Sequence, residues 1–426
     1  MSVAPPVSPA PSRWSAAAGA LDQPGFRVLI LTQMVMGLAQ PLLFFTQGWY
    51  VNEAAPEGDR TVYLGLLGAS RGFVFLLYVT VGGALADRFP RIRILRASHL
   101  LAVAMILVID ALLWVPSVGS GEGAALPLMI ALFASFGLIT AQDLPTRTSM
   151  AREAVPDHLA RGAIALFQLA MASMLLFAAP FAGWAIEHLG IPATYLIAAV
   201  GPAMVFALTF RLPRSVIAAD PDASSMSVVA NIRDGLRVFR EQPAVRWAVF
   251  LTWAATTAGI SVLGILVAAW VSEVLEEGAS GWSTLSLFWA IGSITSSLFI
   301  TAGGLSRYRG ATFLALTLLF GLGVLGFSLS REMWIACAFY TVAGLAFMGQ
   351  NIVGLSIVQA LVPNRYLGRV TGLLMLGQGL MQVSALAVGI LARAIGMEVV
   401  YVAAGIVILV AVAWVALTQR ELRTLD

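Results

Sequence analysis

The sequence predicts an all-α integral membrane protein, with twelve transmembrane helices arranged as two six-helix, pseudo-symmetric bundles. Three observations lead to this fold class: an apolar composition, an uneven placement of arginines, and short motifs that recur half a chain apart. Of the 426 residues, 59% are hydrophobic and 11% are charged, and the mean hydropathy is +0.88. A helix needs about 20 mostly apolar residues to cross the hydrocarbon core of a bilayer. A water-soluble fold has no use for many such runs.

Twelve apolar segments, each bounded by charged residues or by proline and glycine, are the predicted spans. Each is long enough to cross the hydrocarbon core as a helix. In chain order they cover residues 26–51, 62–86, 93–115, 125–146, 160–187, 191–211, 245–272, 282–304, 310–330, 333–361, 367–392 and 398–418.

Arginine placement gives the predicted orientation of these spans. The sequence contains no lysine, so all 25 basic residues are arginines. With both termini in the cytoplasm, the loops and tails on that side carry every arginine except Arg60, Arg331 and Arg393 outside and Arg71 within a span. Short cytoplasmic loops typically hold such an excess of basic residues. The pI of about 9.3 follows from this topology and gives no reason to expect a nucleic-acid partner.

Two short patterns recur half a chain apart. Residues 155–161 and 362–369 share a Val-Pro step followed by a leucine, a small residue and an arginine. Two glycines seven residues apart, with a tyrosine five residues later, occur as Gly183, Gly190 and Tyr195 and again as Gly389, Gly396 and Tyr401. Together the patterns predict two six-span halves of the same orientation, an arrangement that typically holds a substrate near the midplane between the halves.

The predicted domain organisation follows from these halves. The parts are a disordered cytoplasmic tail at 1–24, an N-terminal six-helix bundle at 25–211, a cytoplasmic linker with an amphipathic helix at 212–243, a C-terminal six-helix bundle at 244–419 and a cytoplasmic tail at 420–426. The amphipathic helix is expected near 229–242, where apolar residues alternate with charged ones at helical spacing.

The inner end of the second predicted span carries an acid among arginines. Gly83 lies four residues before Asp87 and Arg88. A glycine permits close helix approach, a carboxylate can accept from an exposed helix N-terminus, and arginines can bridge carboxylates bidentately. We therefore expect a cytoplasmic gate that holds one half against the other, built from Gly83, Asp87, Arg88, Arg91, Asp143 and Arg147.

This run resembles the Gly-x-x-x-Asp-Arg-x-Gly-Arg-Arg/Lys signature of the major facilitator superfamily. Pro90 stands where the signature has its second glycine, and Ile92 stands where it has its final basic residue. Residues 227–253, the Pro145-x-Arg147 pair and the run 368–373 are similar to the bacterial enterobactin-exporter and drug–proton antiporter branch. The resemblance implies the major facilitator fold. It also implies export of a small molecule from the cytoplasm across the bacterial inner membrane by alternating access, driven by proton movement.

Ionisable residues inside a span cost about 2.5 to 3.5 kcal/mol on insertion scales, so they are the candidates for coupling. Three qualify, namely Arg71, Asp110 and Asp143. Arg71, in the outer half of its span, could attract an anionic substrate, pair with an acid or have a structural role. We expect Asp110 to be a water-exposed acid near the outer end of its span. We expect Asp143 to pair with Arg88 or Arg91, with proton carriage as the alternative.

A row of glutamines predicts a cavity of neutral hydrogen-bonding groups. Gln33, Gln40 and Gln47 recur every seven residues, and because a helix drifts by only about 20° per heptad, they share one face. A glutamine row in lipid would be penalised, which favours a cavity, with helix–helix hydrogen bonding as the alternative. The predicted cavity residues are Gln33, Gln40, Gln47, Arg71, Gln168, Trp253, Thr256, Trp289, Gln350, Asn351, Gln378 and Gln382. Little fixed charge among them suits a bulky amphipathic solute, siderophore-like or drug-like.

The sequence leaves coupling open. Span one has no acid and span four no central arginine, where many multidrug antiporters of this superfamily carry theirs. The alternative with the same fold is a lysophospholipid or metabolite transporter or facilitator without proton coupling.

A membrane sensor or an enzyme is a more remote alternative. The three histidines, His99, His158 and His188, are unclustered and near span ends, and Cys337 is the single cysteine. We therefore expect no catalytic, metal or cofactor site. The expected partners are a small-molecule substrate, the lipid bilayer and, in the coupled form, protons, and the chain is expected to be a monomer.

Overall fold

A computed structural model of the chain describes residues 19–86, 90–121, 123–140, 143–156, 158–212, 241–301 and 308–425, and the elements within these ranges are helical. The first half contains α2 (Pro24–Ala54), α3 (Arg60–Ala86), α4 (Arg91–Leu113), α5 (Pro116–Gly119), α6 (Ala125–Thr140), α7 (Asp143–Glu153), α8 (Ala160–Leu208) and the 3₁₀ turn η1 (Thr209–Arg211). The second half contains α10 (Pro243–Ala254), the π-helix η3 (Ala255–Ile265), α11 (Val267–Glu273), α12 (Ala279–Thr301), α13 (Arg309–Leu329), α14 (Met333–Leu361), α15 (Asn364–Ile395), α16 (Met397–Thr418) and α17 (Arg420–Arg423).

Ten of the described helical segments are long and apolar enough to cross a membrane. One of them runs from Gly162 to Arg211 and contains two predicted spans, 160–187 and 191–211. The predicted span 125–146 is divided between α6, whose apolar part is Ala125–Gly137, and the start of α7. The all-α membrane fold is therefore confirmed, while the count of twelve crossings stays a prediction.

The recurring glycines have the same structural roles in both halves. Gly190 and Gly396 have φ angles of 83° and 96°, which L side chains rarely adopt, and each marks the turn between two successive predicted spans. Gly183 of α8 lies against the start of α12, and Gly389 of α15 lies against Thr61 of α3. The pattern that predicted two halves also marks where those halves touch.

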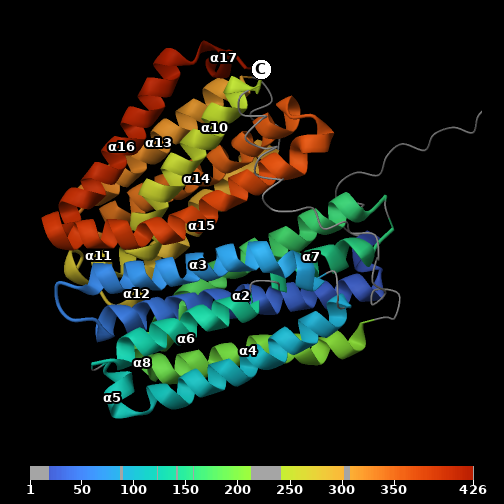
Figure 1. Cartoon of the computed structure of the whole chain (residues 1–426), viewed down its shortest axis with the longest axis vertical. Coiled ribbons are helices and arrows are strands. Elements are labelled where there is room, and N and C mark those ends of the chain that lie inside the picture. The colour runs from blue at the N-terminus through green and yellow to red at the C-terminus, as the bar shows by residue number, and fades with distance from the viewer. Residues whose placement is uncertain are drawn as a thin grey trace, which may run out of the picture.

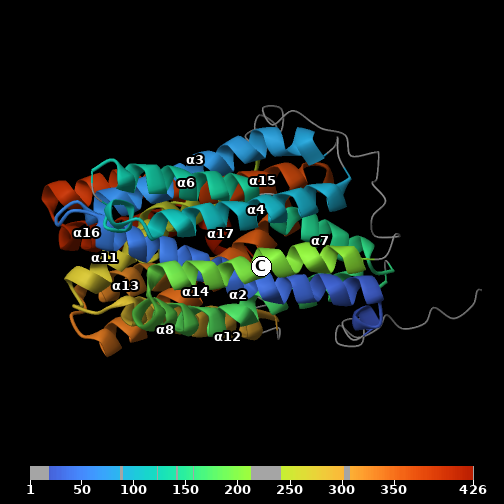
Figure 2. The same cartoon turned by 90° about the horizontal axis from the view of Figure 1, so that it is seen from below.

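The two halves form adjacent bundles (Figure 1). α3 packs against α15 and α8 packs against α12, so these two pairs join the bundles. In the second view, the pair α3 and α15 lies on one side and the pair α8 and α12 on the other (Figure 2). The ribbons run close together at the end that carries α11 and spread apart toward the end that carries α7 and α17 (Figure 1). We call the first the closed end and the second the terminal end.

Polar contacts cross between the halves at the closed end. Two ion pairs join Arg393 Nε to Asp59 at 2.8 Å and Arg60 to Glu273 at 3.5 Å. Hydrogen bonds accompany them: Asn52 Nδ2 donates to Ser272 Oγ (3.1 Å), Thr61 Oγ1 donates to the Gly389 carbonyl (3.1 Å), and the Ser280 N–H donates to the Glu187 carboxylate (2.8 Å). These links hold the two bundles together at one end of the molecule.

Some sequence predictions fall on parts of the chain that the structure does not describe. Asp87 and Arg88 of the predicted gate lie outside the described residues, as does most of the linker with its predicted helix near 229–242. The segment predicted as a C-terminal tail differs from a free tail, because it forms α17 and returns to the bundle. Leu422 is fully buried, and the Gly310 N–H donates to the Leu425 carbonyl at 3.1 Å.

We predict that Gly65→Ala weakens the α3–α15 contact. A Cβ atom at Gly65 would lie 2.6 Å from the Ala385 carbonyl oxygen and 2.8 Å from the Leu386 Cα, which are backbone atoms that cannot turn aside. Overpacking of this kind costs about 1 to 3 kcal/mol. The measurement is the thermal unfolding midpoint of the purified protein in detergent, which should fall.

Gly137→Ala is the matched control for this substitution. Its Cβ atom would lie 4.0 Å from Val74, an ordinary contact, and alanine favours a helix by up to about 1 kcal/mol. The control should be neutral or stabilising. Equal unfolding midpoints for the two variants would contradict the close approach of α3 and α15 at Gly65.

Candidate functional site

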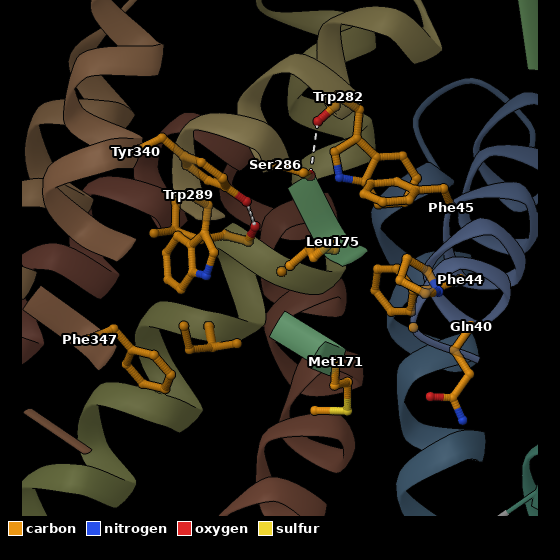
Figure 3. A pocket seen from close by; sticks show the side chains of 15 residues that line it. Gln40, Phe44, Phe45, Met171, Leu175, Trp282, Ser286, Trp289, Tyr340 and Phe347 are labelled. Atoms are coloured by element: carbon orange, nitrogen blue, oxygen red, sulfur yellow. Dashed lines mark hydrogen bonds between the residues drawn. The ribbon is translucent and has the colours of Figure 1, made fainter. Parts of the chain in front are cut away.

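A cavity of about 610 Å³ lies between the two halves. The middle parts of α2 and α8 line it from the first half, and η3, α12 and α14 line it from the second (Figure 3). The lining residues are Gly37, Gln40, Pro41, Phe44, Phe45, Met171, Leu175, Ile260, Leu263, Gly264, Trp282, Ser286, Trp289, Tyr340 and Phe347. None of these side chains carries a charge at neutral pH, and six of them are aromatic.

Aromatic rings close the cavity toward the closed end. The Trp282 ring of α12 packs against three rings of α2, with centroid separations of 4.8 Å to Phe45, 6.0 Å to Phe44 and 6.4 Å to Trp49. Figure 3 shows Trp282 beside Phe45 at the top of the cavity. This packing is possible because Gly48 has no side chain: a Cβ atom there would lie 2.6 Å from the Trp282 ring. The seal is therefore a contact between the two halves.

A second group of rings forms the wall on the side of the second half. Trp289 lies 5.2 Å from Tyr340 and 5.9 Å from Phe347, measured between ring centroids. The Tyr340 hydroxyl donates to the Leu263 carbonyl of η3. A π-helix leaves its carbonyls less regularly paired than an α-helix does, and Tyr401 likewise donates to the Val262 carbonyl at 3.0 Å. The two tyrosines thus fix the irregular helix that presents Leu263 to the cavity.

The glutamine row of α2 divides between two roles. Gln40 lines the cavity. The cavity prediction is wrong for Gln33 and Gln47, which are 0% and 3% exposed and accept hydrogen bonds from Arg147 and Arg71. The reason is that buried guanidinium groups need neutral or acidic acceptors in a site without water. Helix–helix hydrogen bonding therefore accounts for the two outer glutamines.

Arg71 is held inside the first half. Its guanidinium donates to the Gln47 side-chain oxygen, and Gln47 Nε2 donates to the Tyr195 hydroxyl at 3.0 Å. The Arg71 Cζ also lies 5.1 Å from the centroid of the Phe44 ring, a cation–π contact with a residue of the cavity wall. Arg71 therefore joins α3 to α2 and, through Gln47, to α8.

Asp110 differs from the sequence prediction of a water-exposed acid. It is buried, with 8% of its surface exposed, and its Oδ1 has no hydrogen-bond partner within the described residues. It lies close enough to Tyr195 for an electrostatic interaction. The spacing along α4 suggested a position near the outer surface, but the packing of neighbouring helices covers the carboxylate.

Asp143 has a partner within its own helix, and the predicted partner Arg88 lies outside the described residues. Arg147 holds it bidentately, with Nε to Oδ1 at 2.8 Å and Nη2 to Oδ2 at 2.5 Å. Arg91, one of the two predicted partners, pairs instead with Glu153. The i, i+4 spacing on α7 brings Asp143 and Arg147 together within a single helix, which a more distant arginine cannot match.

His99 completes this buried group and was missed by the sequence interpretation. Its Nε2 lies 3.2 Å from Asp143 Oδ1. The signal was available, because His99 lies within the predicted span 93–115 and an ionisable residue there is costly. The position of His99 near the end of its span favoured a peripheral location in the sequence interpretation. The buried cluster therefore comprises Gln33, His99, Asp143 and Arg147.

The other predicted site residues lie at varied depths. Trp289 lines the cavity, whereas the cavity prediction is wrong for Gln350 and Thr256, which are 0% and 2% exposed and face helix carbonyls. Gln168 and Gln378 are exposed, and Trp253, Asn351 and Gln382 are partly buried. Gly83 lies in the last turns of α3. The aromatic residues at 44, 45, 282, 340 and 347 that dominate the cavity were not predicted.

Known proteins resemble this chain in sequence and in structure. The profile of the Major Facilitator Superfamily matches residues 72–385. The chain belongs to this superfamily. It is therefore a multi-pass membrane protein and a secondary transporter. An uncharacterized MFS-type transporter of Bacillus subtilis, YfiS, is 23% identical over 400 residues, which are 90% of each chain.

Solved structures of other major facilitators share the fold. A peptide transporter POT has a TM-score of 0.74 at 16% identity, over 96% of this chain and 98% of its own. A D-xylose–proton symporter has a TM-score of 0.70 at 14% identity, over 94% of this chain and 98% of its own. The third structure is a bacterial homologue of the human lysosomal transporter Spinster in an inward-facing and unoccupied conformation. Its TM-score is 0.69 at 14% identity, over 95% of this chain and 97% of its own. Such identities show the fold alone, and the enterobactin-exporter branch stays a prediction.

The described part of this major facilitator contains no group of three or more His, Cys, Asp or Glu residues that could hold a metal ion. The polar groups described above include the buried cluster of Gln33, His99, Asp143 and Arg147, the group of Arg71, Gln47 and Tyr195, and the neutral groups of the cavity. The first two can carry charge, and the cavity can bind an apolar or aromatic solute.

We predict that Arg147→Met strongly destabilises the protein. Arg147 and Asp143 are each 1% exposed, and removal of one partner of a buried pair costs about 3 to 5 kcal/mol because the other charge stays buried. Arg91→Gln breaks a partly exposed pair with Glu153 and should cost at most about 1 kcal/mol. Unfolding midpoints measure both losses, and a loss for Arg91→Gln as large as for Arg147→Met would contradict the assignment.

Proposed function

We propose that this chain exports bulky amphipathic small molecules across a bacterial inner membrane by alternating access, in exchange for protons. The observation that carries the proposal is the cavity of about 610 Å³ between the two halves, with aromatic walls and no charged side chain among the described residues that line it. Sites for drug-sized molecules typically have volumes of about 300 to 1,000 Å³ and mostly apolar walls with a few polar groups. The cavity matches this description.

The lining favours a cargo with a flat, apolar body. The Trp289 ring lies across the cavity from the Phe44 and Trp282 rings (Figure 3). Aromatic contacts add about 0.5 to 1.5 kcal/mol beyond area burial. Gln40 and Ser286 can each hydrogen-bond a polar substituent. A sugar phosphate or an inorganic ion would find no charge partner on these walls and would lose its hydration there.

The arginine distribution supports loading from the cytoplasm. If both termini are cytoplasmic, as the excess of arginines on that side predicts, the closed end faces outside. The contacts at Asp59, Arg60 and Thr61 then seal the outer side, and the cavity lies on the inner side of the aromatic seal. A transporter in this state accepts cargo from the cytoplasm, which fits an exporter.

The outer seal is of a kind that can open. The ion pair of Arg60 and Glu273 is partly exposed, at 24% and 33%, and exposed pairs contribute only about 0 to 1 kcal/mol each. The contact between the Phe45 and Trp282 rings is uncharged, so separation of these rings would leave no charge unpaired. Separation of the halves at this end would carry a bound cargo from the inner to the outer side.

We predict that an aromatic amphiphile binds in the cavity and raises the unfolding midpoint of the purified protein. The probes are ethidium, tetraphenylphosphonium, a tricatecholate siderophore and lysophosphatidylcholine, compared with glucose 6-phosphate. Trp289→Ala should weaken binding about tenfold, since truncation of an aromatic anchor typically costs more than 1 kcal/mol.

Trp334→Ala is the matched control for this experiment. Trp334 is 73% exposed and lies outside the cavity lining, so its loss should leave the affinity unchanged. A response to glucose 6-phosphate, or equal effects of the two tryptophan substitutions, would count against the cavity as the cargo site. Stabilisation by lysophosphatidylcholine alone would favour a lipid cargo.

We further predict that an imposed pH gradient drives the bound probe across the membrane of proteoliposomes. Acid on the side of the closed end should accelerate loss of the probe from the opposite side, because protons and cargo move in opposite directions in an exchanger. Fluorescence of an entrapped probe measures the flux. Equal rates with and without the gradient would point to a facilitator instead.

A further inference from the structure

The imidazole ring of His99 lies between two hydrogen-bond acceptors inside the first half. Its Nδ1 is 2.8 Å from the carbonyl oxygen of Leu95, one turn earlier on α4. Its Nε2 is 3.2 Å from Oδ1 of Asp143 on α7. His99 is 3% exposed and Asp143 is 1% exposed, so bulk water does not satisfy either contact.

A neutral imidazole cannot satisfy both contacts, because it has one N–H group and one lone pair. Donation to Leu95 leaves the Nε2 lone pair facing an ionised oxygen of Asp143, and the other tautomer leaves the Nδ1 lone pair facing the carbonyl. One more proton removes the repulsion, either on the ring or on the carboxylate. We therefore propose that His99 and Asp143 form a proton-binding site that holds one exchangeable proton between them.

Arg147 determines how this site holds its proton. Its two hydrogen bonds fix the Asp143 carboxylate in place, so that Oδ1 faces both the Arg147 guanidinium and the His99 ring. The positive charge of Arg147 opposes a second positive charge nearby. The ring consequently keeps the proton only while it touches Asp143, which makes proton affinity depend on the position of α7 relative to α4.

Few other ionisable groups face the ring. The charged groups that act on His99 are Asp143 and Arg147, both on α7, and Gln33 of α2, which binds Arg147, is neutral. Among the other elements packed against α4, α5 and α6 have no ionisable residue. The ionisable side chains described on α8 and η1 are Glu187, His188 and Tyr195 toward the closed end and the exposed Arg211.

The site lies where proton loss would change helix packing. The polar links that join α4 to α7 include the buried contact of His99 with Asp143 and the outer pair of Arg91 with Glu153. Loss of the proton leaves a ring lone pair facing either Asp143 Oδ1 or the Leu95 carbonyl, and in the first case the buried link becomes a repulsion that favours separation of the two helices at the terminal end.

A path leads from this site to the cavity. Arg147 Nη1 donates to Gln33 Oε1 at 2.5 Å, and Gln40, seven residues further along α2, lines the cavity. Movement of α7 therefore acts on the helix that forms one cavity wall. The coupling role of the site rests on the proposed exchange of cargo for protons, whereas the binding of a proton by His99 and Asp143 does not.

The test is a titration of the single ring by nitrogen-15 NMR. His158→Gln with His188→Gln leaves His99 as the only imidazole, and the labelled full-length protein is measured in lipid between about pH 5 and about pH 8. We expect the pair to gain one proton across this range, seen as protonation of both ring nitrogens or as a carboxylic-acid band in the infrared. A ring that stays singly protonated beside an ionised carboxylate throughout would overturn the site.

Asp143→Asn is the informative variant, because its amide N–H can replace the shared proton. His99 should then stay neutral, with its proton on Nδ1, at every pH, and the pH gradient should no longer change the flux of the probe. A ring that still titrates as before would exclude Asp143 as the partner. If this variant does not fold, the titration in the parent protein decides alone.

The outcomes separate this inference from the proposed function. A pair that titrates in a protein that moves none of the probes would overturn the proposed export and leave the proton site standing. Probe flux driven by the pH gradient, together with a His99 ring that does not titrate, would support export and reject this site.

Discussion

The internal arrangement of the first half depends on two guanidinium groups, that of Arg147, which is buried, and that of Arg71, which is partly buried. Hydrocarbon offers no water to an unpaired polar group, so Arg71 and Arg147 must find acceptors within the protein. Both find them on α2, at Gln47 and Gln33. These glutamines are fourteen residues apart, or about 21 Å along a helix, and Gln40 faces the cavity midway between them. One helix thus anchors two charged clusters and forms the wall of the site that separates them.

In the second half, neutral groups make the buried polar contacts described above. Hydroxyl groups bond to backbone carbonyls in and around the π-helix η3: Tyr340 donates to Leu263 and Tyr401 to Val262 of η3, and Ser261 of η3 donates to the Met381 carbonyl of α15. The duplicated halves have therefore diverged in chemistry while they kept the glycine turns at Gly190 and Gly396. The charged clusters described above lie in the first half, and most of the aromatic lining of the cavity comes from the second.

Much of the fold could be predicted from the sequence, because apolar length and arginine placement act on whole segments. The Gly183 and Gly389 pattern even marked the contacts between the halves. The site was harder. Gln33, Gln40 and Gln47 share a face, but whether a neighbouring arginine reaches each one depends on packing between distant segments. His99 meets Asp143 only because α4 and α7 are adjacent, and aromatic residues such as Phe44 are common in any span.

An uncharged cavity has an electrical consequence. Since none of the described lining residues is charged, the charge that crosses the membrane with the cargo is the cargo's own. A charge that moves through a potential of about 100 mV gains or loses about 2.3 kcal/mol. Exchange of a monovalent cation for one proton would be electrically silent, whereas exchange of a neutral molecule would move one net charge. The same walls would therefore make the membrane potential decisive for some cargoes and irrelevant for others.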